Sequence, residues 1–133
     1  MVLRFRVKRY SEFVSKDKLE KIPYNKRGIY ALLKKRHITK KHADKRYDVI
    51  YIGMSRSDIK KRLRKHRTSK RKGDLWNYFS IFEADSKTTD RAIEDMEGIL
   101  RQIYRRDSKA NRLNTQRKYK KIRGRLIGID EWK

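Results

Sequence analysis

The chain has 133 residues, no cysteine, and 40 Lys and Arg against 16 Asp and Glu, so its formal net charge is +24. This length suits one compact domain, and the lack of cysteine excludes a disulfide framework and a thiolate metal site. No apolar run approaches the roughly 20 residues that a membrane helix needs. We therefore expect a soluble, intracellular protein, cytoplasmic or nucleoid-associated, whose partner is a polyanion such as nucleic acid.

The first predicted elements are strands. Basic and apolar residues alternate over 4–10, which is typical of a half-buried strand with its cations turned outward. Short β-rich runs at 28–33 and 49–53 predict two strands that pair in one sheet. The segment between them, residues 34–46, predicts an exposed basic loop, which either contacts phosphate or simply keeps the surface solvated.

The second half of the chain predicts two helices and further strands. A helix over roughly 58–68 follows a polar cap. The aromatic run at 75–82 predicts a strand, and the longest helix starts near Thr88, Thr89 or Asp90 and ends at about Arg106. Residues 125–129 can form an edge strand.

The longest helix carries a carboxylate at the margin of its apolar face. At about 100° per residue, Glu97 lies beside the apolar stripe, which consists of Ile93, Met96, Leu100, Ile103 and Tyr104. A carboxylate in this position costs free energy unless it is paired or bound to a metal. The pattern leaves two partners open, an ion pair with Arg62 or a divalent cation.

Charge is unevenly distributed along the chain. Residues 31–75 carry 17 basic and 4 acidic side chains, whereas residues 76–97 carry 2 basic and 6 acidic ones. Most of these acids are expected to solvate a helix start and complement its dipole, namely Glu83, Asp85, Asp90, Glu94 and Asp95.

Two tripeptides and an ordered set of polar residues resemble one nuclease family. The tripeptides are Gly28-Ile29-Tyr30 and Tyr51-Ile52-Gly53, and Ser55, Arg62, His66, Glu97 and Asn114 follow in order. Over residues 28–114 the chain resembles the GIY-YIG nuclease superfamily. The resemblance implies an α/β fold of the α+β type, with a small three-stranded, mostly antiparallel sheet flanked by helices. Residues 1–27 are then an N-terminal strand or extension and 115–133 a basic tail, all in a single domain, 1–133.

The same resemblance implies metal-dependent hydrolysis of phosphodiester bonds in DNA. It assigns Tyr30 to the attacking water, Arg62 to the phosphate, and Glu97 to one Mg²⁺ or Mn²⁺ ion. Tyr51, His66 and Asn114 match the supporting positions. The residue types suit the chemistry, because a guanidinium offers phosphate a forked set of donors and Mg²⁺ prefers oxygen ligands.

The basic segments predict contacts with the nucleic-acid backbone, and double-stranded DNA is the expected partner of a monomer or transient dimer. The predicted contacts are Lys34, Lys35, Arg36, Lys40, Lys41, Arg64, Lys65, Arg67, Lys70 and Arg71. The alternative function is a non-catalytic basic protein that binds nucleic acid and resembles ribosomal proteins in size and charge.

Overall fold

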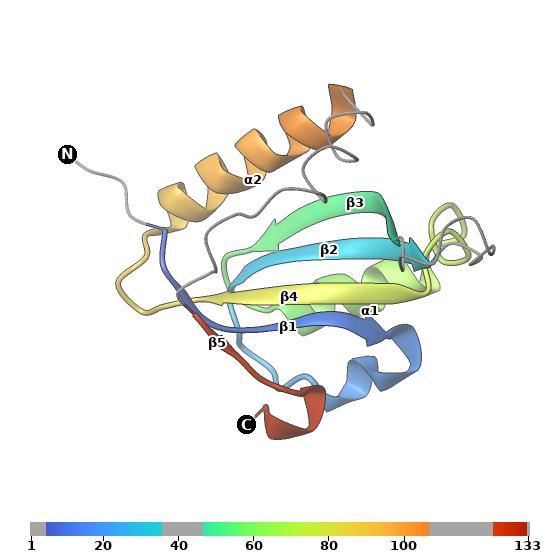
Figure 1. The fold of residues 1–133 in the computed structure, drawn as a ribbon, viewed down its shortest axis with the longest axis horizontal. Helices are drawn as coiled ribbons and strands as arrows, with labels where there is room; N and C mark the ends of the chain where they lie inside the picture. The colour runs from blue at the N-terminus through green and yellow to red at the C-terminus, as the bar shows by residue number, and fades with distance from the viewer. Residues whose placement is uncertain (1–4, 36–46, 107–123, 133) are drawn as a thin grey trace, which may run out of the picture.

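A computed structural model describes residues 5–35, 47–106 and 124–132. Its α+β fold is built on one sheet of five strands in the order β3-β2-β4-β1-β5 (Figure 1). The strands are β1 (Val7–Ser15), β2 (Gly28–Lys35), β3 (Tyr47–Ser55), β4 (Tyr78–Ala84) and β5 (Arg125–Leu126). All neighbouring strands pair antiparallel except β1 and β5, which are parallel.

The prediction of a three-stranded sheet is wrong in the number of strands. The three expected strands correspond to β2, β3 and β4, with β2 in the middle. The edge of β4 that faces away from β2 has backbone donors and acceptors that need partners, and β1 pairs with it. β5 in turn pairs with the other edge of β1. The sheet therefore extends beyond the predicted core by one strand from each end of the chain.

Helices flank the sheet, as predicted, and the two helices cover its opposite faces. Tyr30 and Leu32 of β2 belong to the larger core cluster, together with residues of α1 (Ile59–Thr68). Ile29, next to Tyr30, belongs to a second cluster with Ile93 of α2 (Asp90–Arg106). Because successive side chains of a strand point to opposite faces, β2 supplies both cores at once.

The C-terminal segment is part of the larger core. Ile127, Ile129 and Trp132 are buried in it. Ile129 begins the short 3₁₀ helix η2 (Ile129–Glu131), which lies near the 3₁₀ helix η1 (Lys16–Lys21). The Trp132 indole donates a hydrogen bond of 2.7 Å to Ser11 Oγ on β1. The edge strand predicted at 125–129 is thus confirmed at Arg125–Leu126. The burial of the residues that follow it was not expected for a basic tail.

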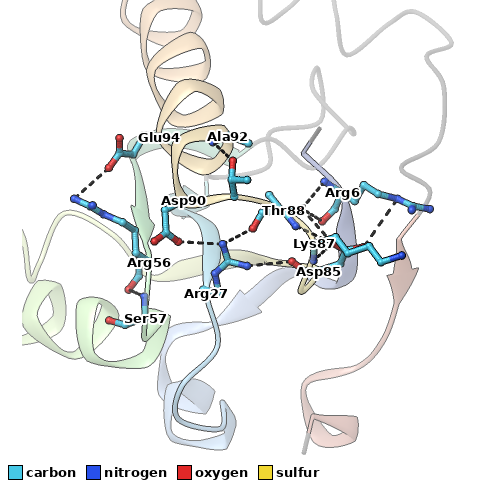
Figure 2. A network of polar contacts seen from close by, with 12 residues as sticks. Arg6, Arg27, Arg56, Ser57, Asp85, Lys87, Thr88, Asp90, Ala92 and Glu94 are labelled. Atoms are coloured by element: carbon cyan, nitrogen blue, oxygen red, sulfur yellow. Dashed lines mark hydrogen bonds and ion pairs between the residues drawn. The ribbon is translucent and has the colours of Figure 1, made fainter. Parts of the chain in front are cut away.

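A polar network fixes the start of α2 against the sheet (Figure 2). Arg27, which precedes β2, donates to the carbonyl oxygens of Asp85 at 3.1 Å and Thr88 at 2.5 Å and pairs with Asp90 at 3.0 Å. One turn further along, Glu94 pairs with Arg56 at 3.1 Å. Asp90 and Glu94 thus act at the helix start as expected, and the Asp85 carboxylate accepts hydrogen bonds from Lys87 N and Thr88 N just before it. The expectation is wrong for Glu83, which is buried on β4 and pairs with Arg9 at 2.7 Å.

The second half of α2 extends beyond β3, as Figure 1 shows. Ile93 is buried and Met96 and Leu100 are half-buried, as the predicted apolar face requires. Ile103, however, is 46% exposed, so its predicted burial is wrong. The sheet ends before that turn of the helix and offers Ile103 no surface to pack on.

In the described part of the chain, no helix is both long enough and apolar enough to cross a membrane.

Candidate active site

Three predicted site residues meet beside the edge strand β3. Tyr30 lies on β2, Tyr51 on β3 and His66 on α1. The Tyr30 hydroxyl is 2.9 Å from His66 Nε2, and the centres of the Tyr51 and His66 rings are 4.8 Å apart. The two tyrosine rings are 6.3 Å apart. The sequence therefore predicted a cluster that the fold brings together from three elements.

Gly53 makes room for the Tyr30 ring. A Cβ atom on residue 53 would lie less than 3 Å from atoms of both Tyr30 and Tyr51. Glycine is therefore required at this position, because any larger residue would push the two rings apart. Packed in this way, the Tyr30 side chain is only 1% exposed.

Burial sets the protonation states of the hydrogen-bonded pair. It raises the pKa of Tyr30 well above the usual 10, and the nearby Tyr51 adds to this effect. It lowers the pKa of His66 below 6.5, with smaller contributions from Lys72 and Arg62. Both groups are therefore neutral at pH 7, and the Tyr30 hydroxyl donates to His66 when the imidazole carries its proton on Nδ1.

Arg62 and Glu97 approach this cluster from different helices. The charge of Arg62 favours ionisation of Tyr30, whereas that of Glu97 opposes it, so both charges act on the Tyr30 hydroxyl. Arg62 is exposed on α1, and the Glu97 side chain on α2 is 20% exposed. The site is thus buried at Tyr30, half-buried at Glu97 and exposed at Arg62.

Two cations at the site were not predicted. Lys72 Nζ lies 4.1 Å from the centre of the Tyr51 ring, and the Arg101 guanidinium lies 5.2 Å from it. Arg101 also forms an ion pair with Glu97, with 3.7 Å between Nη1 and Oε1. The ion pair could have been predicted from the sequence, because Glu97 and Arg101 are four residues apart on one helix. Lys72 stands in a run of basic residues, and no sequence feature distinguishes it.

The ion-pair partner of Glu97 is Arg101, whereas the sequence suggested Arg62. Among the described residues, Arg62 forms no ion pair. Its spacing from His66 puts the two side chains one helical turn apart, and Arg62 contributes to the lowered pKa of His66. Arg62 is therefore available to a ligand rather than committed to the fold.

Glu97 is the carboxylate that could hold a metal here. Within the residues that the structure describes, no group of three or more His, Asp or Glu side chains is arranged as a metal site. A single carboxylate fits Mg²⁺, because this ion keeps several water ligands and takes further oxygens from substrate phosphates. The same donor set would not fit zinc, which requires three or four protein ligands.

The predicted contacts with nucleic acid fall into four groups. Lys34, Lys65, Lys70 and Arg71 are exposed. Arg64 and Arg67 instead bind the Glu20 carboxylate, at 2.5 Å and 3.0 Å. Lys35 is half-buried and lies near the Tyr78 ring. Arg36, Lys40 and Lys41 lie outside the described part of the chain. The predicted site residue Asn114 lies outside it as well.

We expect Glu20→Gln to destabilise the fold by about 1 kcal/mol at neutral pH, since an exposed ion-pair network is screened by solvent. Hydrogen bonds from Arg64 and then Arg67 lower the pKa of Glu20 to about 2. A lowered carboxyl pKa stabilises the fold above the unfolded value near 4.5, and this contribution is lost as pH falls towards 2. Urea unfolding at pH 7 and pH 3 checks this, and an equal difference at both pH values contradicts it.

Comparison of the chain with protein-family models finds no match. Comparisons with curated proteins and with solved structures find none either.

Proposed function

We propose that the chain is a metal-dependent endonuclease that hydrolyses phosphodiester bonds in DNA, with a GIY-YIG-like site at the edge of β3. The observation that carries the proposal is the hydrogen bond of 2.9 Å between Tyr30 and His66. It joins the residues that the nuclease family uses at these motif positions, although they are 36 residues apart in the chain.

The Tyr30–His66 pair is a route for a proton. Because Tyr30 donates to His66 Nε2, its oxygen can accept a hydrogen bond from a water molecule and orient it. As that water attacks phosphorus, its proton passes to Tyr30 Oη while the Tyr30 proton passes to Nε2. The raised pKa of Tyr30 supports this relay, since a lone phenolate is not available at pH 7.

The charged residues supply the remaining functions. Arg62 binds the non-bridging phosphate oxygens with its forked donors. Glu97 would hold a metal ion, which would stabilise negative charge on the phosphate and on the leaving oxygen. Tyr30 is 1% exposed, so the side chains packed around its hydroxyl, Tyr51 among them, have to move to admit water when DNA binds. Lys72 and Arg101 lie against the Tyr51 ring, and their positive charges can bind the phosphates of the incoming DNA.

The proposal is tested with end-labelled duplex, single-stranded and branched DNA, each incubated with Mg²⁺, Mn²⁺ or EDTA in oxygen-18 water. We expect cleavage only with metal, and oxygen-18 in the phosphate of the product, because water is the nucleophile. Binding without cleavage under all these conditions contradicts the proposal and favours the non-catalytic nucleic-acid-binding protein.

We expect Arg101→Ala to tighten the binding of Mn²⁺ to the DNA-free protein about two- to fivefold, which is the equivalent of one weak ion pair. Arg101 pairs with Glu97 Oε1 and reduces its negative charge. Electron paramagnetic resonance of free Mn²⁺ measures the affinity. Arg91→Ala, which removes an exposed arginine from the first turn of α2, serves as the control. Unchanged or weaker binding in the Arg101 variant would mean that the ion pair does not compete with the metal.

A further inference from the structure

A second aromatic cluster lies away from the candidate active site. Phe13 of β1 stacks on Tyr47 of β3, with ring centres 4.4 Å apart and planes inclined by 21°. Tyr78 of β4 meets Tyr47 edge to face at 5.4 Å. Strands β1 and β3 are separated in the sheet by β2 and β4, so these side chains reach across the sheet.

Phe13 adopts a backbone conformation that is rare for a bulky residue. Its φ is +53°, in the left-handed region, within a bulge of β1 between Ser11 and Val14. A hydrogen bond of 3.0 Å from Phe13 N to Ser80 Oγ holds the bulge. The neighbours Ser11 and Val14 are 1% and 8% exposed, whereas Phe13 is 48% exposed. The strained bulge thus presents an aromatic ring to solvent, and such strain often marks a functional site.

One lysine beside the cluster can bind an anionic group. Lys35 Nζ lies 5.6 Å from the centre of the Tyr78 ring, and Lys35 is the cross-strand partner of Tyr47, so it shares the face of the cluster. Lys34, one residue earlier on β2, points to the opposite face. Exposed Glu12, beside Phe13, brings one opposing charge. Rings that stack on bases, next to cations that contact phosphates, are the usual components of surfaces that bind single-stranded nucleic acid.

We propose that Phe13, Tyr47 and Tyr78 form a stacking platform for the bases of single-stranded DNA, with Lys35 beside it for the phosphates. The choice of DNA rests on the proposed function, whereas the platform itself does not require cleavage. Duplex DNA keeps its base faces stacked inside the helix and cannot use the platform. The platform therefore gives the protein a preference for substrates that contain an unpaired strand.

The platform is tested by fluorescence anisotropy in EDTA, with a labelled single strand and the duplex made from it, at one fixed salt concentration. We expect Phe13→Ala to weaken binding of the single strand about 5- to 150-fold, the usual effect of losing one stacked base. Binding of the duplex should not change. Phe13→Trp should retain the affinity of the wild type, because it restores an aromatic face. Leu126→Ala removes an exposed apolar side chain of β5, 57% exposed, and is the matched control.

Photocrosslinking of 5-iododeoxyuridine DNA to the wild-type protein gives a readout that does not depend on the folding of a variant. We expect crosslinks at Phe13, Tyr47 or Tyr78. The proposal is overturned if crosslinks fall only elsewhere, if Phe13→Ala weakens both DNA forms equally, or if the effect appears with single-stranded RNA alone. Since no metal is present, these results stand whether or not the protein cleaves DNA.

Discussion

Replacing Tyr30 with Phe is expected to reduce the rate of DNA cleavage about 10²- to 10⁴-fold, the usual contribution of a positioned proton-transfer group. The variant keeps the ring that packs against Gly53 and loses only the hydroxyl. His66 Nε2 then has no partner at 2.9 Å, and the attacking water loses the oxygen that orients it. Single-turnover cleavage of a labelled substrate measures the effect.

Tyr10→Phe is the matched control for this variant. Tyr10 is likewise a buried tyrosine of the sheet, 5% exposed, and its ring stacks on Phe82 rather than on a site residue. We expect this control to cleave at the wild-type rate and to unfold at a similar temperature. Equal rates for wild type and Tyr30→Phe would remove Tyr30 from the mechanism, even if the protein proves to be a nuclease.

Replacing Glu97 with Gln is expected to slow metal-dependent cleavage roughly 10³-fold, the rate equivalent of the several kcal/mol that a bound metal supplies. The neutral amide keeps the shape of the side chain and loses the charge that holds the ion. Affinity for DNA should stay the same or rise slightly, because a negative charge is removed near the phosphates.

Glu94→Gln controls for the loss of one carboxylate from α2. Glu94 lies one turn before Glu97 and forms an ion pair with Arg56 at the helix start. We expect a small loss of stability and normal cleavage. If Glu94→Gln abolishes cleavage and Glu97→Gln does not, then the metal ligand has been assigned to the wrong turn of the helix.

Local patterns in the sequence predicted the elements that form the site. The β-rich runs around Tyr30 and Tyr51 became β2 and β3, and Asp58 caps α1 by accepting a hydrogen bond from Lys61 N. α2 begins at Asp90 and ends at Arg106, as the apolar periodicity indicated. These signals are short-range, so a single sequence carries them.

Features that depend on distant contacts were not predictable. β1 begins at Val7 and runs to Ser15, later than the predicted 4–10, because its position is set by pairing with β4. The bulge at Phe13 depends on Ser80, and the burial of Trp132 depends on Ser11. The position of Lys72 over Tyr51 likewise arises only when the chain folds back. Each of these contacts joins residues whose spacing follows no period of a helix or strand.

The most direct test of the candidate active site compares the wild-type protein with the double variant Tyr30→Phe/Glu97→Gln, purified in parallel and incubated with supercoiled plasmid. We predict that the wild type nicks the plasmid with Mg²⁺ and not with EDTA. The double variant should bind the plasmid with the affinity of the wild type and leave it intact. Equal nicking by both proteins, or binding by the wild type with no nicking at any metal concentration, would contradict the assignment of a nuclease site to the edge of β3.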